Sequence, residues 1–393
     1  MSGISGFFVK YIRQTNKLLL LVSLLISAFG LIAIKSAQRA YNTDYFKTQL
    51  VAVIIGYAFA FIITLIDYHE YGNLWYLVAG FCIFLMLYTL AFATSVQSSG
   101  GVNARAWITI AGRSFQPSEL VKIGFMVTFA KHASSIKENG NIDSFLHVAS
   151  LGVHALIPMA LCHLQGDDGA AIIFFFMFIF MSFAAGVKYK YFIGLFSAIL
   201  VIVPIIWNTG FLAEYQKLRF TSIFHLDDPN FDRNTIYQQI QGRTSIGSGR
   251  FLGQGLFEGP RVTNGTVPFQ HSDYIFSTIG EELGFVGCCF ALILIFALLA
   301  ITVYCAVSAK DTEGALICYG FCGLIASQTI FNIGMCLTLL PVMGVTLPFF
   351  SAGGSSAMCL YFGLGLVQNV AMRNSKSERT MLRKNYAANG YVG

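Results

Sequence analysis

Long apolar stretches recur along most of the chain, and polar residues gather in the segments between them. Crossing the hydrocarbon core of a bilayer takes about 20 predominantly apolar helical residues. By that standard the sequence predicts about ten transmembrane helices, at residues 18–34, 50–66, 74–93, 117–131, 147–164, 169–187, 191–207, 284–307, 315–340 and 355–371. We therefore expect an all-α, polytopic membrane protein that forms a single transmembrane domain over residues 1–393.

One polar segment is much longer than the others, because residues 208–273 separate the seventh and eighth predicted helices. A membrane protein keeps irregular backbone only where water or protein can satisfy its hydrogen bonds. The segment ends in Val-Pro-Phe-Gln-His-Ser-Asp-Tyr-Ile-Phe, in which Asp273 is the lone carboxylate. This loop is where we expect chemistry, with Asp273 as the candidate acid or base.

Composition excludes the soluble classes of protein. The chain is 55% hydrophobic and 11% charged, against about 25% charged residues in soluble domains, and its mean hydropathy is +0.65. The net charge of +6 comes from basic residues scattered between apolar stretches, so it does not indicate a nucleic-acid partner. All nine cysteines lie in or beside apolar stretches, which argues against a disulfide framework.

The distribution of lysine and arginine predicts which side of the membrane each end occupies. Cytoplasmic loops are enriched in these residues. If every predicted helix crosses, one side carries Lys10, Arg13, Lys17, Lys131, Lys137, Lys188, Lys190 and Lys310, and the basic tail with Arg373, Lys376, Arg379, Arg383 and Lys384. Lys35, Arg39 and Lys47 lie on the other side, but the balance places both termini in the cytoplasm and the 208–273 loop outside.

Asp273 allows two interpretations. With His271 and Ser272 beside it at the membrane edge, its carboxylate could take a proton from a substrate hydroxyl as a general base. Alternatively, Ser272 or Asp273 caps the following helix, since their side-chain oxygens are favoured at helix N-termini. Spacing by itself favours the cap. Glu281 and Glu282, about two helical turns later, are either functional or placed at the interface near a helix start.

A second charged group lies inside a predicted helix. Glu119 and Lys122 are three residues apart, so they share a helix face. In a membrane they must pair with each other or with a third charge, and Asp167 is the available candidate. Structural pairing is the simpler interpretation; in the functional one, Lys122 lines a cavity that holds an anionic part of a substrate.

Other polar motifs could contribute to an outer substrate site. Arg105 and Trp107 combine a cation with an interfacial aromatic ring. In the long loop, Arg243 and other basic residues surround a Gly-rich run, and glycine backbone with arginine can bind phosphate. Ser355 and Ser356 lie before the last helix, either in a tight turn and cap or with their hydroxyls in the outer cavity. The acidic run 227–232 could bind Mg²⁺ or Mn²⁺ through oxygen ligands, although a solvated loop explains it as well; the sequence assigns no metal ligand and requires no cofactor.

Taken in order, these motifs resemble those of the SEDS family (shape, elongation, division and sporulation), polytopic membrane proteins that handle lipid-linked cell-wall precursors. The motifs are Ala-Arg-Ala-Trp at 104–107, Phe-Gln-Pro-Ser-Glu-Leu-Val-Lys at 115–122, Gln-Gly-Asp-Asp-Gly at 165–169, Ile-Gly-Ser-Gly at 246–249, His-Ser-Asp-Tyr-Ile-Phe at 271–276, Gly-Glu-Glu-Leu-Gly at 280–284, Asn-Ile-Gly-Met at 332–335, and Leu-Pro-Phe at 347–349 with the following serines and glycines. Each is weak by itself, but their order is specific and covers most of the chain.

The resemblance implies a fold and an activity. SEDS proteins have ten transmembrane helices, cytoplasmic termini and a large outer loop between the seventh and eighth helices. Members of the RodA and FtsW type are peptidoglycan glycosyltransferases of the bacterial cytoplasmic membrane, which polymerise lipid II with a class B penicillin-binding protein. The resemblance places the essential loop aspartate at Asp273 and the substrate-binding positions at Arg105, Trp107, Glu119, Lys122 and Asp167. The sequence of the loop slightly favours an elongation-type, RodA-like member.

The chain also departs from the family pattern. A Pro-Glu pair usually precedes the His-Thr-Asp motif, and this chain has Pro268-Phe269-Gln270. Ala106, Gly166, Asp168 and Ala352 also replace the usual residues. If Asp273 is the base, we therefore expect it to act without a neighbouring carboxylate.

The activity that we expect is inverting glycosyl transfer to an acceptor hydroxyl. A single base suits this reaction better than a retaining hydrolysis, which needs two carboxylates. The main alternative is a flippase for the lipid-linked precursor, which would use Glu119, Lys122 and Asp167 and would need polar groups accessible from both faces in turn. A scaffold for wall synthesis is a third class, and it would tolerate loss of Asp273.

Overall fold

The computed structural model describes residues 11–97, 103–110, 113–210, 214–225, 228 and 233–388. Within these residues, ten helices of 18 or more residues dominate. They are α2 (Lys17–Ala37), α3 (Tyr45–Leu65), α5 (Trp75–Phe92), α6 (Pro117–Glu138), α7 (Phe145–Leu164), α8 (Asp168–Ala185), α9 (Tyr189–Asn208), α13 (Ile275–Val307), α14 (Thr312–Cys336) and α15 (Gly354–Ala388). Each predicted apolar stretch falls on one of these helices, which confirms the all-α, polytopic fold class.

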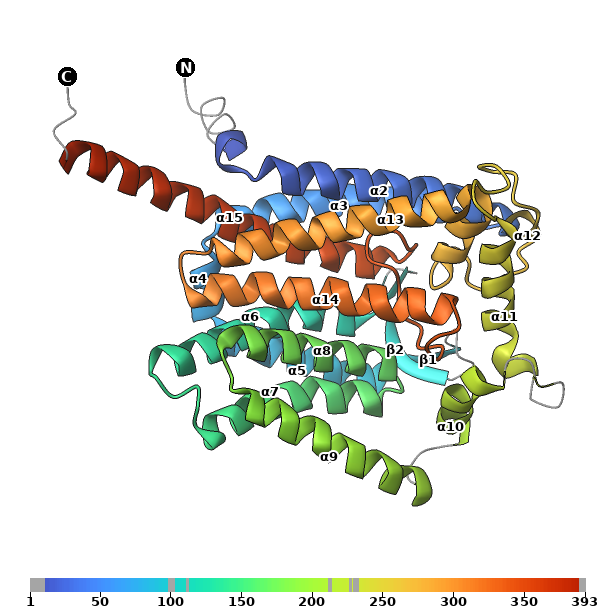
Figure 1. Cartoon of the computed structure of the whole chain (residues 1–393), viewed down its shortest axis with the longest axis horizontal. Helices are drawn as coiled ribbons and strands as arrows, with labels where there is room; N and C mark the ends of the chain where they lie inside the picture. The colour runs from blue at the N-terminus through green and yellow to red at the C-terminus, as the bar shows by residue number, and fades with distance from the viewer. Residues whose placement is uncertain are drawn as a thin grey trace.

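The long helices run side by side as an elongated bundle (Figure 1). The start of α2 and the end of α15 lie at one end, and α10, α11 and α12 cover the other, which we call the loop end. Helices α14 and α15 lie innermost, with 78% and 83% of their apolar windows buried, whereas α9 has none of its window buried. Helix α15 packs on α3, and α14 packs on α8 and α13.

Helix α6 differs from the other nine. Among the described residues, nine helices are long and apolar enough to cross a membrane, and α6 is the exception. Its first turns carry the buried Glu119 and Lys122. Because α6 packs against α5, α8, α14 and α15, other helices rather than lipid surround its polar residues.

The long loop was predicted to be irregular, and that prediction was wrong. It contains α10 (Glu214–Thr221), the 3₁₀ helix η2 (Ser222–Phe224), α11 (Arg233–Ser248) and α12 (Pro260–Thr263). On α11, the buried positions include Gln239 and Ser245 beside Ile236. A helix whose buried face is largely polar lacks the apolar periodicity that reveals a helix in sequence.

Three short strands were also missed. They are β1 (Thr94–Gln97), β2 (Asn103–Ile110) and β3 (Arg113–Phe115), which pair antiparallel in the order β1-β2-β3. The remaining short elements are η1 (Gln38–Ala40) after α2 and α4 (Tyr68–Asn73) before α5. The strands lie at the loop end (Figure 1) and lead directly into the start of α6.

Helix α13 is broken near its start by the Gly-rich part of the loop. Gly284 has φ 62° and ψ −160°, which interrupts the helical hydrogen bonds. The loop replaces them, because the backbone N–H groups of Phe285 and Val286 donate to the carbonyls of Arg250 (2.9 Å) and Phe251 (3.2 Å). In return, the N–H of Gln254 donates to the carbonyl of Glu281 at 3.0 Å. The loop is thereby fixed to the helix that begins just after Asp273.

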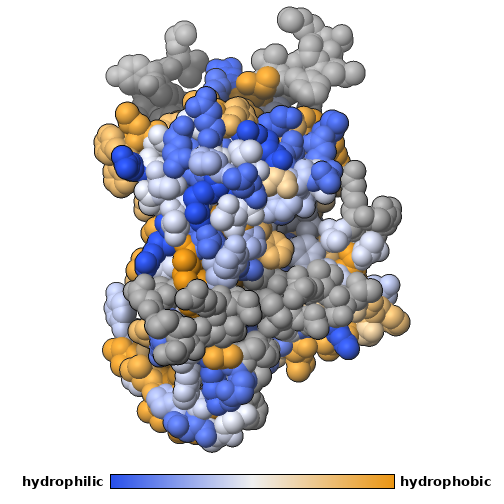
Figure 2. All heavy atoms as spheres, turned by 90° about the vertical axis from the view of Figure 1, so that its right-hand side faces the viewer, coloured by the Kyte–Doolittle hydropathy of each residue, from blue (hydrophilic) through white to orange (hydrophobic). Residues whose placement is uncertain are grey.

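Polar side chains gather on the loop end of the bundle. Figure 2 looks onto this end and shows hydrophilic residues over much of its upper part, with hydrophobic residues at its margins. The helix sides carry many exposed large apolar residues, including Phe84, Leu200 and Phe296. This distribution fits a bundle whose sides contact lipid and whose loop end contacts water.

Replacing Gly253 tests the interlock between the loop and α13. Gly253 has φ +83°, and a Cβ there would collide with the Glu282 carbonyl, so we expect Gly253→Ala to destabilise the protein by about 1–3 kcal/mol. The measurement is the thermal unfolding midpoint of the purified protein in detergent. Gly247→Ala is the matched control, because a methyl group added at Gly247 on α11 would have nothing within 4 Å; an equal loss in both variants would contradict the interlock.

Candidate active site

Asp273 lies at the loop end, immediately before α13. Its side chain is buried, with 8% relative exposure. The N-cap residue of α13 is Tyr274, whose side chain makes no cap hydrogen bond. The Ser272 hydroxyl is directed at the Phe269 carbonyl at 3.4 Å. The helix-cap interpretation of Ser272 and Asp273 is therefore wrong, because Tyr274 occupies the N-cap position.

The backbone of Asp273 is fixed by the inner helix α14. Asn332 is fully buried, and its Nδ2 donates to the carbonyl oxygens of Asp273 and Val345, both at 2.7 Å. One amide group thus joins the end of the long loop to the segment that connects α14 with α15. Asn332 belongs to one of the sequence motifs, but the sequence did not indicate this role.

The two residues before Asp273 are held by the same connecting segment. The Ser351 hydroxyl donates to the Ser272 carbonyl at 2.7 Å, and the Ala352 N–H donates to the His271 carbonyl at 2.8 Å. Three consecutive carbonyls therefore have partners on α14 or on the segment after it. Such fixing of the backbone limits the positions that the Asp273 side chain can reach, which favours a defined geometry for a reacting group.

His271 contacts two aromatic rings, one from the first residue of α3 and one from the segment between η1 and α3. Its ring stacks on Tyr45, with centroids 3.9 Å apart and planes inclined by 15°, and meets Tyr41 edge-on at 4.8 Å. Burial lowers the pKa of His271 to about 4. The ring is therefore neutral at pH 7, so it can donate or accept a hydrogen bond without placing a charge beside Asp273.

Gln270 lies in the segment where the chain departs from the family pattern. Its side chain is fully buried, and Nε2 donates to the carbonyls of Ala37 (3.0 Å) and Val262 (2.7 Å). A carboxylate at this position would place negative charge against two carbonyl oxygens. An amide therefore suits position 270 better than a carboxylate does. The neighbouring Phe269 has a left-handed backbone conformation, with a φ of 57°.

Glu119 and Lys122 pair with each other inside the bundle. Lys122 Nζ lies 2.8 Å from Glu119 Oε1, and the side chains of Lys122 and Glu119 are 2% and 8% exposed. Asp167 does not join them through a hydrogen bond: its Oδ2 accepts from Gln116 Nε2 (2.7 Å) and Ser118 Oγ (3.1 Å). The proposed third charge is thus satisfied by polar groups at the start of α6.

Ser355 and Ser356 occupy the buried start of α15. Ser355 Oγ accepts from the Gln116 N–H at 3.4 Å, and Ser356 Oγ donates to the Gly353 carbonyl at 3.3 Å. Ser355 and Asp167 are therefore both bonded to Gln116. A continuous set of contacts runs from Asp167 through the start of α15 to the segment that holds Asp273.

Arg105 and Trp107 lie on β2, near Asp167. The Arg105 N–H donates to the carbonyl of Gln165 at 2.9 Å, which fixes the strand to the turn that carries Asp167. The Arg105 side chain is exposed and Trp107 is half-buried. Arg105 therefore offers a cation at the loop end, as the sequence predicted.

Arg243 lies on α11, which covers the start of α13. The preceding Gly242 packs on Tyr274, since a Cβ there would come within 2.7 Å of the ring. Arg243 itself is exposed. The Gly-rich run after α11 is not a phosphate cradle, because Gly249 and Gly253 lie against the backbone of α13.

Glu281 and Glu282 are structural. Glu281 Oε1 accepts from the N–H groups of Arg261 (2.7 Å) and Val262 (3.2 Å), at the start of α12. Glu282 Oε1 accepts from the Ser36 hydroxyl at 2.5 Å. Both carboxylates hold the loop to the bundle and are separate from the Asp273 group.

The divalent-cation prediction falls largely outside the described residues, since only Asp228 of the run 227–232 is described. Over the part of the chain that the structure covers, no group of three His, Cys, Asp or Glu residues is disposed to hold a metal ion. A divalent cation therefore stays a prediction, without assigned ligands.

The ion pair predicts a specific stability pattern. Lys122→Met leaves Glu119 buried without its partner, which should cost on the order of 3–5 kcal/mol. The double variant Glu119→Leu/Lys122→Leu removes both charges, so it should regain most of the stability that Lys122→Met loses. Unfolding midpoints in detergent measure both, with Lys137→Met, an exposed lysine of the same helix, as the control. A double variant less stable than Lys122→Met would contradict the pairing.

His271 predicts a dependence of stability on pH. Its pKa is about 4 when folded, against an ordinary value of 6.5 for histidine, so between these values the unfolded state binds more protons. His271 should therefore reduce stability as pH falls from about 6.5 to 4, by at most about 3 kcal/mol. His271→Phe should flatten that slope in pH-dependent melting. The control is His225→Phe, which replaces an exposed histidine of the same loop and should leave the slope unchanged. An unchanged slope in His271→Phe would refute the link between His271 and the pH dependence.

Comparison with known proteins shows similarity to one family over most of the chain. The FtsW/RodA/SpoVE family model, described as "Cell cycle protein", matches residues 16–376. The "Probable peptidoglycan glycosyltransferase FtsW" of Geobacter sulfurreducens is 30% identical over 380 residues, covering 94% of this chain and 98% of that protein. "Stage V sporulation protein E" of Bacillus subtilis is 31% identical over 370 residues, covering 90% and 96%.

Solved structures agree with the fold. The "Rod shape determining protein RodA" of Thermus thermophilus is 26% identical with a TM-score of 0.67, covering 92% of this chain and 97% of that one. A chain from "Structural coordination of polymerization and crosslinking by a peptidoglycan synthase complex" is 28% identical with a TM-score of 0.77, covering 92% and 98%. This chain is a multi-pass membrane protein that belongs to the FtsW/RodA/SpoVE family, the SEDS proteins.

Proposed function

We propose that this protein is a peptidoglycan glycosyltransferase that polymerises lipid II at the outer face of the cytoplasmic membrane, with Asp273 as the general base. The observation that carries the proposal is the placement of Asp273. Asp273 is buried and lies directly before Tyr274, the N-cap residue of α13, and its backbone carbonyl is held by Asn332. A buried carboxylate on a backbone fixed in this way is typical of a functional site.

The proposed sidedness rests on charge. Lys137 lies in the last turn of α6, and Lys188 and Lys310 lie in connections between helices, at the end of the bundle opposite the loop end. Cytoplasmic loops and the helix ends beside them are rich in such residues. This supports cytoplasmic termini and a loop end that faces outward. Asp273 would then meet its substrates where the outer leaflet ends.

The proposed reaction is a single displacement with inversion. Asp273 accepts the proton of the acceptor GlcNAc 4-hydroxyl while that oxygen bonds to the anomeric carbon of the donor sugar. The bond from this carbon to the pyrophosphate oxygen breaks, and the polyprenyl pyrophosphate leaves with the electron pair. Because pyrophosphate is a weak base, no general acid is needed, and one carboxylate is sufficient.

Cations at the loop end would stabilise the leaving group. Arg105 and Arg243 are exposed there and can bind phosphate oxygens bidentately. Lys122 is less suited, since Glu119 offsets its charge at 2.8 Å. We therefore assign the pyrophosphate contacts to the two arginines and a supporting, structural role to the ion pair. Mg²⁺ or Mn²⁺ bound to the pyrophosphate is an optional source of further positive charge.

The remaining polar residues would shape the acceptor side. His271 is neutral and fixed by Tyr45, so it can orient a sugar hydroxyl. Trp107, half-buried on β2, offers an apolar ring face for a sugar. Ser272, Ser355 and Ser356 would complete the polar lining. Asp167 would contribute indirectly, because it accepts a hydrogen bond from Gln116, which is also bonded to Ser355.

A class B penicillin-binding protein is the proposed partner. One solved neighbour comes from a complex that coordinates polymerization and crosslinking, by its title. A glycan strand made at the loop end must be crosslinked outside the membrane, so a transpeptidase held nearby fits the chemistry. A flippase would need polar groups accessible from both faces in turn, whereas the candidate substrate residues Asp273, Arg105 and Arg243 all lie on elements of the loop end.

Replacing Asp273 tests the proposal. Asp273→Ala should bind lipid II with wild-type affinity and polymerise it at least about 100-fold more slowly, since base catalysis contributes about 10²–10⁴-fold. The assay follows labelled lipid II with purified protein, with and without a penicillin-binding partner and with Mg²⁺, Mn²⁺ or chelator. The control is Glu258→Gln, an exposed carboxylate in the same loop.

Two outcomes decide between the functions. Polymerisation by Asp273→Ala at the wild-type rate would refute its catalytic role. Transport of labelled lipid II across vesicle membranes by wild-type protein, without polymer formation under any of these conditions, would favour the flippase.

A further inference from the structure

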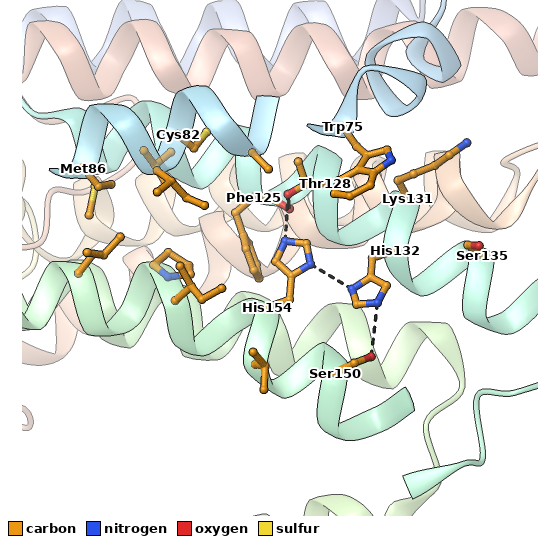
Figure 3. A pocket seen from close by; sticks show the side chains of 17 residues that line it. Trp75, Cys82, Met86, Phe125, Thr128, Lys131, His132, Ser135, Ser150 and His154 are labelled. Atoms are coloured by element: carbon orange, nitrogen blue, oxygen red, sulfur yellow. Dashed lines mark hydrogen bonds between the residues drawn. The ribbon is translucent and has the colours of Figure 1, made fainter. Parts of the chain in front are cut away.

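A cavity lies between α5, α6 and α7, and Asp273 is not among the residues that line it. Its volume is about 540 Å³, within the roughly 300–1,000 Å³ typical of ligand pockets. Most of its wall is apolar, with Cys82, Met86 and Phe125 among the lining residues, and two histidines, His132 and His154, supply polar atoms (Figure 3). It lies along the flank of α6 that carries Val121 and Phe125, whereas Glu119 and Lys122 pair with each other elsewhere on this helix.

The histidines belong to a chain of hydrogen bonds along the cavity wall. Thr128 Oγ1 lies 3.1 Å from His154 Nε2, and the Nδ1 atoms of His154 and His132 are 3.1 Å apart. The chain ends at His132 Nε2, whose contact with Ser150 Oγ measures 3.4 Å (Figure 3). Two facing Nδ1 atoms form a hydrogen bond only when one is protonated and the other is not.

The ends of the chain favour one direction for its protons. The Thr128 hydroxyl is directed at the carbonyls of Gly124 (3.0 Å) and Phe125 (3.2 Å), so its oxygen accepts from His154 Nε2–H. His154 Nδ1 then accepts from His132 Nδ1–H, and neutral His132 keeps a lone pair on Nε2. The Ser150 hydroxyl donates to the His147 carbonyl at 2.7 Å, a much shorter contact than the one to His132.

The opposite direction is less favourable. Thr128 would have to turn its hydroxyl away from the helix carbonyls, and the last bond, from His132 Nε2–H to Ser150, would be 3.4 Å long. Bonds of that length are weak. The cavity therefore presents a hydrogen-bond acceptor, His132 Nε2, whose contact with Ser150 Oγ is long at 3.4 Å, so a better-placed donor entering these mainly apolar surroundings would be favoured.

The mouth of the cavity faces the side of the bundle. Val153 and Ile157 of α7 line it and are 57% and 43% exposed, and α5 and α7 are among the helices apolar enough to cross a membrane. A molecule can therefore enter from the bilayer without passing the loop end. His132 lies six residues before the end of α6, so a lipid whose hydrocarbon chain fills the apolar part of the cavity can place a polar group at this acceptor.

We propose that this cavity is a binding site for an uncharged membrane lipid that carries a free hydroxyl group. The hydrocarbon chain would lie along Cys82, Met86 and Phe125, and the hydroxyl would donate to His132 Nε2. A charged headgroup is disfavoured, because Lys131 beside the cavity is already paired with Glu313 at 3.2 Å. The site is separate from the proposed glycosyltransferase reaction and does not depend on it.

The test is photolabelling of the full chain in phosphatidylcholine nanodiscs. The probe is hexadecanol with a diazirine in its chain, and mass spectrometry locates the labelled peptides. We expect labelling on α5, α6 and α7, which excess hexadecanol suppresses at least about 10-fold more effectively than hexadecyl methyl ether, because the ether lacks the donor. Equal competition by the ether would refute the hydroxyl requirement.

Matched variants locate the site. Val153→Trp should fill the mouth and abolish labelling, whereas Leu156→Trp, equally exposed at 57% on the same helix but not lining the cavity, should leave it unchanged. His132→Phe should keep labelling but remove the preference for the alcohol over the ether. Unfolding midpoints confirm that each variant is folded. Labelling that persists in Val153→Trp, or an alcohol preference that survives in His132→Phe, would overturn the proposal.

Discussion

The structure depends on one constraint: in a bilayer, every buried backbone N–H and carbonyl group must find a partner within the protein. The break at Gly284 would leave such groups exposed in α13, and the loop at Arg250 and Phe251 supplies their partners. The same requirement joins the carbonyl of Asp273 to Asn332. The large loop is therefore an integral part of the bundle, and the position of Asp273 follows from backbone hydrogen bonding.

Much of the fold could be predicted from the sequence, because lipid imposes a simple rule of length and apolarity. The rule found all ten long helices, including α6, whose Glu119 and Lys122 weaken its apolar signal. It did not find α11. The buried side of this helix includes the polar residues Gln239 and Ser245, so its sequence lacks the periodic apolar pattern that indicates a helix. The strands of the β1-β2-β3 sheet were missed because they are short and lie between spans.

The candidate site was predictable in its members but not in its connections. Asp273, Arg105 and the buried ion pair could be chosen from residue type and motif order. The roles of Asn332, Ser351 and Gln116 depend on contacts between segments far apart in the chain, which spacing does not reveal. The helix-cap interpretation of Asp273 was reasonable by spacing, and it failed because α13 begins one residue later, after Tyr274.

The central claim is that the Asp273 carboxylate accepts a proton during glycosyl transfer. Chemical rescue tests it most directly: Asp273→Gly would be assayed for lipid II polymerisation with increasing formate, and with chloride at the same concentrations. A small carboxylate can replace a missing base, whereas chloride replaces only the charge. The account predicts a rate that rises with formate and not with chloride. Equal rescue by both anions, or wild-type activity of Asp273→Gly without either, would contradict it.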